Sequence, residues 1–210
     1  MIKQHKKMLI LTSVITLLPI FIGLLLWRQL PASVATHFGV DNQPDGYCSK
    51  AFAVFGLPVM MLFFHFICIV ATNIDPKRKN ISKKVFHVVM WICPVISLVN
   101  CNISMYIIWD ISSILDLSAI VLGILYLILG NFIPKVKLNY SIGFRIPWAL
   151  NDSDNWYHTH RFGGKCMVIG GIAMIVTSPF QNVWIFLALV IVPCILPVVY
   201  SYMFYRKTMG

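Results

Sequence analysis

Long and almost uncharged apolar runs, separated by short polar segments, constrain this chain more than any other feature. A membrane-spanning helix needs about 20 apolar residues in succession, and such runs recur along the whole sequence. The composition agrees, because 59% of the residues are hydrophobic, only 11% are charged, and the mean hydropathy is +0.80. A soluble domain carries about 25% charged residues. The sequence therefore predicts an all-α, polytopic membrane protein.

The apolar runs predict six transmembrane helices. The first is expected to be a retained anchor and not a signal peptide, because it is about 20 residues long and no small-residue cleavage site follows it. The fifth run is short for a span, so its helix is expected to begin earlier, near His160. The turn-like stretch "SPFQN" predicts that the last two helices form a hairpin. The expected ranges are 8–27, 51–72, 85–109, 117–133, 166–179 and 183–205.

The lysines and arginines predict the orientation in the membrane. All but Arg28 and Lys50 of the 17 basic residues fall on one set of termini and loops. Basic residues stay on the cytoplasmic side of short loops, so both termini are expected in the cytoplasm of a bacterial cell, with the protein in the plasma membrane. Basic residues spread along membrane flanks suit lipid headgroups, so the net charge of +10 does not indicate nucleic-acid binding.

Three segments are expected along the chain. The first, 1–72, is an N-terminal membrane module with an ordered extracellular loop at 28–50. The second, 73–116, holds a basic cytoplasmic loop and the third helix. The last, 117–210, is a C-terminal module with a cytoplasmic polar loop at 134–165.

The outer loop reads "LPASVATHFGVDNQPDGYCSK" at 30–50. Its prolines, glycines, Asn and Asp predict a chain of turns, and long ordered loops are often functional. A lid that only caps the helices is the alternative. Metal binding by His37, Asp41 and Asp45 is less favoured than hydrogen bonding, because no further ligand pattern accompanies them. The candidate residues of this loop are His37, Asp45, Gly46, Tyr47 and Lys50.

The densest polar and aromatic stretch reads "NYSIGFRIPWALNDSDNWYHTHR" at 139–161. Guanidinium groups fork onto phosphate or carboxylate, and tryptophan favours the membrane interface. Gly143 and Pro147 disfavour a helix through Arg145, which predicts a compact interfacial or re-entrant loop. The candidate binding residues are Asn139, Gly143, Arg145, Pro147, Trp148, Asn151, Trp156, His160 and Arg161.

Two interpretations of this cluster stay open. In the first it is a structural latch, with the arginines paired to Asp152 or Asp154. In the second it is a polar site that binds a ligand or a partner. Catalysis is not expected, because the sequence has no nucleophile elbow, HExxH or phosphate-binding glycine loop. His158 and His160 would share a face in an extended loop, but no third metal ligand is evident, so neither a metal nor a cofactor is expected.

A few polar residues lie inside the apolar runs, namely His65, Asn100 and Asn102. Polar side chains at this depth usually hydrogen-bond across helices, and only sometimes line a pathway. We expect the packing role. A run of intramembrane carboxylates would suggest a proton-coupled transporter, and this sequence has none.

Two motifs resemble the SdpI family of bacterial integral-membrane immunity proteins. The first lies in the outer loop. The second covers 130–164, where the family pattern runs GN..PK.K.N, then IG.R..W.L, then W..THR..G. Phe144 and Ile146 depart from it, because the family usually has small or hydroxylic residues there. The matching residues are Leu30, Pro31, His37, Phe38, Gly39, Pro44, Asp45, Gly46, Tyr47, Ser49 and Lys50 in the first, and Gly130, Asn131, Pro134, Lys135, Lys137, Asn139, Ile142, Gly143, Arg145, Pro147, Trp148, Leu150, Trp156, Thr159, His160, Arg161 and Gly164 in the second.

The resemblance implies protection of a bacterium from a secreted, cannibalism-type peptide toxin that attacks the membrane. It also implies that some members relay the presence of toxin to a cytoplasmic repressor. The outer loop would then meet toxin or stabilise the bundle, and the loop around Arg145 and Arg161 would carry the protective or signalling conformation. One rival is a lipid-handling protein whose Arg145, Arg161 and Lys165 hold an anionic headgroup. The other is a scaffold that binds a soluble regulator through 134–165.

Overall fold

The computed structural model describes the backbone of residues 2–39, 43–109 and 114–209, and the side chains in these ranges other than those of 3, 38, 100–117 and 209. The chain divides into two compact units. The N-terminal unit comprises Met1–Asn73 and His87–Ile114, and the C-terminal unit comprises Ile74–Phe86 and Leu115–Gly210. The expected middle segment, 73–116, is thus shared between the two units.

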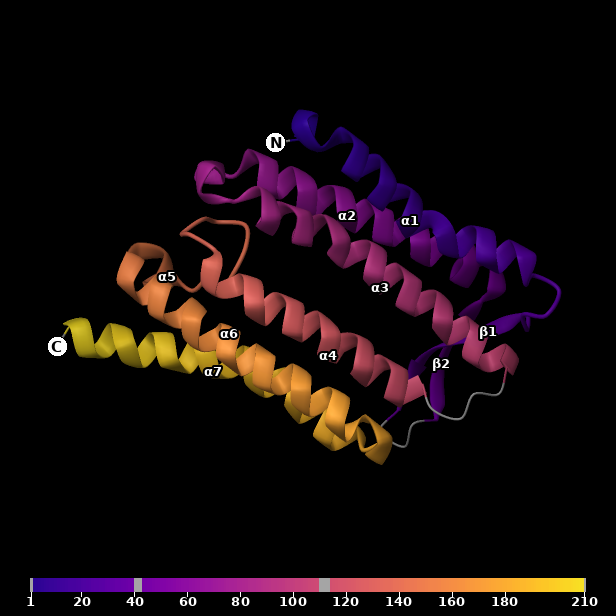
Figure 1. The fold of residues 1–210 in the computed structure, drawn as a ribbon. Helices are drawn as coiled ribbons and strands as arrows, with labels where there is room; N and C mark the ends of the chain where they lie inside the picture. Colours follow the sequence, from indigo (N-terminus) through magenta and orange to yellow (C-terminus); the bar gives the residue numbers. More distant parts are fainter. Residues whose placement is uncertain (1, 40–42, 110–113, 210) are drawn as a thin grey trace. The chain divides into compact units, whose positions relative to one another are not determined.

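The N-terminal unit is a group of long helices with a small β-hairpin. The short 3-10 helix η1 (Ile2–His5) leads into α1 (Lys6–Leu25). The π-helical turn η2 (Phe52–Gly56) leads into α2 (Leu57–Ile74), and α3 (Lys83–Trp109) follows after the 3-10 turn η3 (Arg78–Asn80). Helices α1, α2 and α3 run side by side (Figure 1).

Buried hydroxyl and imidazole groups join these three helices. The Thr12 hydroxyl lies 3.1 Å from His65 Nε2, and both side chains are fully buried. Ser97 Oγ on α3 donates a 2.8 Å hydrogen bond to the carbonyl of Thr16 on α1. The expected interhelical bond of His65 is therefore confirmed. The side chains of Asn100 and Asn102, of which the same was expected, lie outside the described residues.

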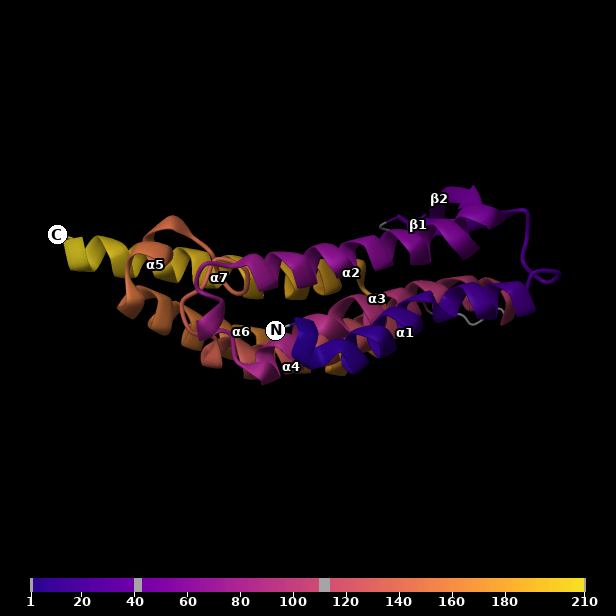
Figure 2. The ribbon, with the colours of Figure 1, turned by 90° about the horizontal axis from the view of Figure 1, so that it is seen from above.

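The outer loop contains an antiparallel β-hairpin of β1 (Ser33–Phe38) and β2 (Pro44–Ser49). Ala35 pairs with Tyr47, and the register becomes irregular on both sides of His37. The chain of turns expected here was wrong in this respect, because β-branched and aromatic residues on either side of the turn-forming stretch favour paired strands. Figure 2 shows the hairpin beside the beginning of the α2 region.

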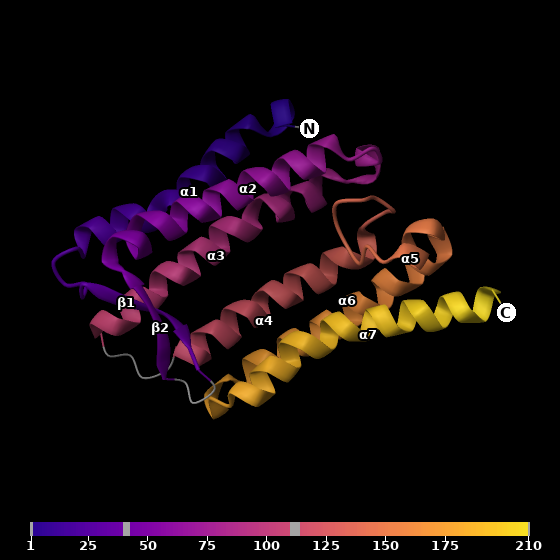
Figure 3. The same ribbon diagram turned by 180° about the vertical axis from the view of Figure 1, so that it is seen from behind.

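The C-terminal unit contains the remaining helices. They are α4 (Ile114–Phe132), the 3-10 turn η4 (Ile133–Lys135), the short α5 (Pro147–Asn151), α6 (Ser153–Thr177), the 3-10 turn η5 (Ser178–Phe180) and α7 (Val183–Met209). Gln181 takes a left-handed conformation after η5 and reverses the chain. Helices α6 and α7 then pack along each other, which confirms the expected hairpin (Figure 3).

Glycines bring α6 close to both of its neighbours. A Cβ on Gly130 of α4 would lie 2.7 Å from the carbonyl oxygen of Gly164 on α6. A Cβ on Gly171 of α6 would lie 2.6 Å from the carbonyl oxygen of Gly123 on α4. On another face of α6, a Cβ on Gly170 would lie 2.6 Å from Cγ of Pro193 on α7. Such small residues let helix backbones approach closely in membranes.

Five helices in the described part of the chain are long and apolar enough to cross a membrane. They cover Lys6–Leu25, Phe52–Ile74, Ser118–Lys135, Ser153–Phe180 and Val183–Thr208. An all-α, multi-pass membrane protein is therefore confirmed. The remaining expected span, 85–109, coincides with α3, whose side chains from residue 100 onward are not described, so a total of six stays a prediction. The orientation of the termini also stays a prediction.

Candidate functional site

The first part of the densest polar stretch lies in a loop, residues 136–146, that packs on the first turns of α6. The expectation that the loop continues to 165 was wrong, because α6 already begins at Ser153, before the start expected near His160. The carboxylate of Asp152 accepts a 2.8 Å hydrogen bond from the backbone N–H of Asp154 and thereby caps the helix. Trp156, His160 and Arg161 consequently lie on a helix and not in a loop.

His160 joins the loop to α6. Its side chain is 1% exposed, and its Nδ1 lies 2.8 Å from the carbonyl oxygen of Trp156. A carbonyl only accepts, so Nδ1 carries the proton, and Nε2 is then free to accept the 3.1 Å hydrogen bond from the backbone N–H of Phe144. Gly143 has a φ of 110°, and a Cβ there would collide with the His160 ring. Gly143 is therefore the residue that lets the loop rest on the imidazole.

Trp156 forms the second contact between α6 and the loop. The indole N–H donates a 2.9 Å hydrogen bond to the carbonyl of Val136, and the side chain is 3% exposed. Its ring stacks on that of His160, with 3.9 Å between centroids and an interplanar angle of 23°. An interfacial position with the indole in the headgroup layer was expected, but the ring is buried inside the protein.

Asn139 organises the loop from within. Its amide nitrogen donates to the carbonyls of Lys137 and Ile142, at 2.9 and 3.2 Å. Its amide oxygen accepts from the backbone N–H groups of Ser141 and Ile142, at 2.9 and 2.7 Å. The two donors and the acceptor oxygen of this fully buried amide are therefore used for the loop itself. We name the set Asn139, Gly143, Trp156 and His160 the buried lock.

Asp75 also holds the loop, and sequence reasoning missed it. It follows α2, is 3% exposed, and accepts hydrogen bonds from the Tyr140 N–H at 2.9 Å and the Ser141 hydroxyl at 2.5 Å. Asn80 donates a further 2.7 Å bond to the carbonyl of Leu138. A lone Asp between an apolar run and a basic run gave no signal of this role, because its partners lie 65 and 66 residues away.

Asn155 is a second buried polar group that the sequence did not single out. Its amide oxygen accepts from the hydroxyls of Thr159 at 2.9 Å and Ser201 at 2.5 Å, and its amide nitrogen donates to the Ser201 carbonyl at 3.0 Å. All three side chains are fully buried. The hydrogen bonds of Asn155 thus connect α6 to α7.

Replacing Asn155 by alanine is expected to lower the free energy of unfolding by about 1–3 kcal/mol, because buried polar groups of Ser201 and Thr159 would lose their partners. Thermal unfolding of the detergent-purified protein measures the change. Asn151→Ala is the matched control, since Asn151 is exposed on α5. Equal stability of the two variants would contradict the role of Asn155.

The structure separates the two histidines that an extended loop would have placed on one face. Both lie on α6, where a spacing of two residues points them in different directions. His158 is exposed and stacks on Phe204, whereas both ring nitrogens of His160 are already hydrogen-bonded. The face-sharing expectation was therefore wrong.

Arg145 and Arg161 are exposed, and each is held by a nearby group. Arg145 donates a 3.0 Å hydrogen bond to the carbonyl of Tyr140. Arg161 donates a 2.9 Å bond to the hydroxyl of Tyr157 and lies over its ring. Within the described residues neither guanidinium forms an ion pair with a carboxylate, so the structure does not show the pairing with Asp152 or Asp154 that the latch interpretation included. Both positive charges remain accessible to a ligand.

The other three candidates of the cluster line an open groove of about 540 Å³ at α5. Its walls are Pro147, Trp148, Asn151 and Asp152 on one side and Tyr205 and Thr208 of α7 on the other. The Trp148 ring lies 6.2 Å from that of Tyr205 and 5.4 Å from that of Tyr202. The Trp148 N–H is covered by protein and has no acceptor among the described residues. The structure thus divides the candidate cluster into the buried lock, two exposed arginines and this groove.

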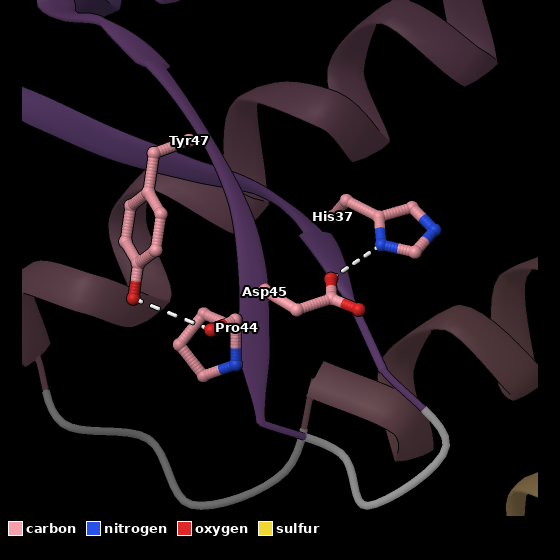
Figure 4. Close-up of polar contacts among 4 residues, drawn as sticks. All are labelled: His37, Pro44, Asp45 and Tyr47. Carbon is pink, nitrogen blue, oxygen red and sulfur yellow. Dashed lines mark hydrogen bonds and ion pairs between the residues drawn. The ribbon is translucent and has the colours of Figure 1, made fainter.

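The candidate residues of the outer loop lie on the hairpin and at its base. Figure 4 shows the His37 ring facing the Asp45 carboxylate, with 2.5 Å between Nδ1 and Oδ1, and both side chains are exposed. Gly46 pairs with His37 across the strands, where a Cβ would lie 2.8 Å from Cβ of His37. The Tyr47 hydroxyl donates a 3.4 Å bond to the carbonyl of Pro44. Asp41, the third candidate for a metal site, lies outside the described residues.

Lys50 connects the base of the hairpin to the end of α1. Its ammonium group donates to the carbonyls of Trp27 and Leu30, at 3.0 and 3.1 Å, and lies 4.8 Å from the centroid of the Trp27 ring. A cation at a helix C-terminus is favourable. Lys50 therefore has a structural role, while the exposed His37, Asp45 and Tyr47 form the accessible surface of the hairpin.

The fold and the site define a multi-pass helical membrane protein in which the buried lock fastens a polar loop to a transmembrane helix. Residues 135–201 match the SdpI/YfhL protein family, and residues 14–62 match a domain of unknown function (DUF1648). The chain is 27% identical over 205 residues to the "Immunity protein SdpI" of Bacillus subtilis (strain 168), covering 96% of this chain and 97% of that protein. No solved structure matches. Both matches agree with the resemblance to the SdpI family that the motifs of the sequence indicated.

Proposed function

We propose that this protein is an immunity protein of the bacterial plasma membrane, which protects the cell from a secreted, membrane-active peptide toxin. The observation that carries the proposal is the similarity to an immunity protein along nearly the whole chain. A match of this extent includes both the outer hairpin and the 136–146 loop. Both segments therefore have counterparts in the relative, as a shared mechanism would require. The basic residues support an orientation with both termini in the cytoplasm and the hairpin outside.

The hairpin supports a role in meeting the toxin. Tyr47 is 59% exposed, and the neighbouring His37 and Asp45 are exposed as well, so an aromatic ring and a polar pair are presented together. Exposed aromatic residues often anchor protein–peptide contacts. Lys50 ties this surface to the end of α1, which would connect toxin contact to the transmembrane helices.

The buried lock supports a role for the cytoplasmic loop in protection or in relaying toxin presence to a repressor. It holds Arg145 in a loop whose own backbone is fastened by Asn139 and His160. Arg145 is exposed and unpaired with any carboxylate in the described part of the chain. A guanidinium that is fixed in position by its surroundings can bind a carboxylate or a phosphate of a partner through two parallel hydrogen bonds.

Arg145→Ala is expected to abolish protection while leaving folding unchanged. The test expresses wild type and variant in a toxin-sensitive bacterium at equal membrane levels and measures depolarisation after a cannibalism-type toxin peptide is added. We expect the wild type to keep its membrane potential and the variant to lose it within the same time. Lys207→Ala, a loss of one exposed basic residue on α7, is the matched control and should still protect.

Depolarisation of wild-type cells at the same rate as cells without the protein would contradict the immunity proposal for that toxin. Protection by Arg145→Ala equal to wild type would leave immunity intact and exclude the role of this arginine. A pull-down of a cytoplasmic repressor with wild type but not with Arg145→Ala would support the relay.

The second proposal is a lipid-handling role, in which Arg145, Arg161 and Lys165 hold an anionic headgroup. It is favoured by the exposure of all three residues and by the lack of a carboxylate partner for the two arginines among the described residues. A phosphate-containing lipid that co-purifies with wild type and is lost on Arg145→Ala would support it. Retention of the same lipid by the variant would exclude it.

A further inference from the structure

The groove between α5 and the end of α7 combines side chains that neither of the two proposed functions uses. Its lining combines the aromatic rings of Trp148 and Tyr205 with the carboxylate of Asp152 and the amide of Asn151. Asp152 uses its Oδ1 to cap α6, and it forms no ion pair within the described residues. A carboxylate beside aromatic faces is a favourable environment for an organic ammonium group.

The charge of the surrounding chain makes this carboxylate distinctive. The protein has a net charge of +10, and the last turn of α7 carries Arg206 and Lys207, on faces of the helix other than the one that the groove residues Tyr205 and Thr208 share. An isolated anion would be attracted to these basic residues outside the groove and repelled by Asp152 inside it. A ligand with a positive and a negative group close together can place its positive group against Asp152 and its negative group toward the basic residues outside.

The position of the groove along the transmembrane helices indicates the source of such a ligand. Helix α6 begins at Ser153, immediately after Asp152, and the apolar span of α7 ends at Thr208. The groove therefore lies where two spans meet the membrane interface, which is also where Trp and Tyr side chains are favoured. Phospholipid headgroups fill this layer.

Helix α7 also offers a path for an acyl chain. Tyr205, Tyr202 and Val198 lie at spacings of three and four residues, which places them on one face of the helix. Tyr202 is 46% and Val198 is 37% exposed. The acyl chain of a lipid whose headgroup lies in the groove could therefore pack along this face of α7.

We propose that the groove binds the headgroup of phosphatidylethanolamine, with the ammonium group against Asp152 and the rings of Trp148 and Tyr205. A primary ammonium donates hydrogen bonds to the carboxylate and to the amide oxygen of Asn151, whereas the quaternary ammonium of phosphatidylcholine has no N–H to donate. The site is separate from Arg145 and Arg161 and does not depend on the immunity proposal.

Native mass spectrometry of the full chain, with phosphatidylethanolamine, phosphatidylcholine or phosphatidylglycerol of the same acyl chains added at equal concentration, tests the proposal. We expect wild type to retain phosphatidylethanolamine about tenfold more than either other lipid, since a hydrogen bond to a charged group has this strength. Asp152→Asn should remove the preference. Asparagine caps helices as well as aspartate does, so this variant loses the charge but keeps the start of α6.

Asp154→Asn is the matched control, because Asp154 is an exposed neighbouring acid outside the groove lining, and it should keep the wild-type preference. Tyr205→Leu, which removes one ring, should weaken retention without a change of charge. Equal retention of the three lipids by wild type would overturn the proposal. So would the same preference in Asp152→Asn as in Asp154→Asn, at matched thermal stability.

Discussion

Replacing Gly143 by alanine is expected to lower the free energy of unfolding by about 3 kcal/mol or more. The residue has a φ of 110°, which costs a non-glycine residue about 1–3 kcal/mol. The added Cβ would also collide with the His160 ring, and forced overpacking costs about 1–3 kcal/mol more. Thermal or denaturant-induced unfolding of the protein in detergent measures the loss. The 136–146 loop should also become more accessible to protease.

A double-mutant cycle with His160→Ala separates the two contributions. Removing the imidazole costs stability by itself, since Phe144 N–H loses its acceptor, but it makes room for a Cβ at Gly143. The alanine at Gly143 should therefore cost less in the His160→Ala background than in wild type. An identical cost in both backgrounds would mean that backbone strain alone explains the effect, and a stable single variant would refute the role of Gly143 in the buried lock.

Replacing Gly130 by alanine is expected to destabilise the C-terminal unit by about 2 kcal/mol. The new Cβ would lie 2.7 Å from the Gly164 carbonyl oxygen and 2.9 Å from the Val168 nitrogen, and both are backbone atoms of α6 that no side-chain rotation can move. Alanine normally favours a helix over glycine by about 1 kcal/mol. A loss of stability in the unfolding measurement would therefore report the helix contact and not helix propensity.

Gly56→Ala is the control for this substitution. The three atoms nearest to a Cβ there all belong to the ring of Phe52, which is 48% exposed and free to rotate away. We expect a change of less than about 1 kcal/mol, because the clash is with a mobile side chain and alanine favours helical backbone. Gly130→Ala as stable as wild type would show that α4 and α6 separate without cost.

Much of the site was predictable because its residue types are individually informative. Gly143 and Pro147 marked the non-helical loop, and the structure places the loop at 136–146 with α5 beginning at Pro147. The arginines were expected to be available for an anionic group, and both are exposed. Trp156 and His160 were selected as polar or interfacial residues, but the structure buries both and uses their polar atoms to hold the loop.

The sequence did not indicate Asp75, Asn155 or Ser201, although each is buried and hydrogen-bonded. Their partners lie far away along the chain, as in the bond from Asn155 to Ser201 across 46 residues. Single polar residues of these types occur in many exposed loops and helix ends. Only packing reveals that a particular one is enclosed and must be satisfied.

The multi-pass helical character of the chain and its similarity to the SdpI/YfhL family could be read from the sequence alone. The length of an apolar run and the spacing of a motif are properties of the linear chain, and they do not depend on which segments meet in space. The start of α6, the β-hairpin and the division of the polar cluster into the buried lock, the two arginines and the groove became visible only in three dimensions. The physical reason is that burial and hydrogen-bond partnership depend on which segments meet in space. The carboxylate of Asp75 and the amide N–H of Tyr140 illustrate this, because neither residue specifies the contact without the other.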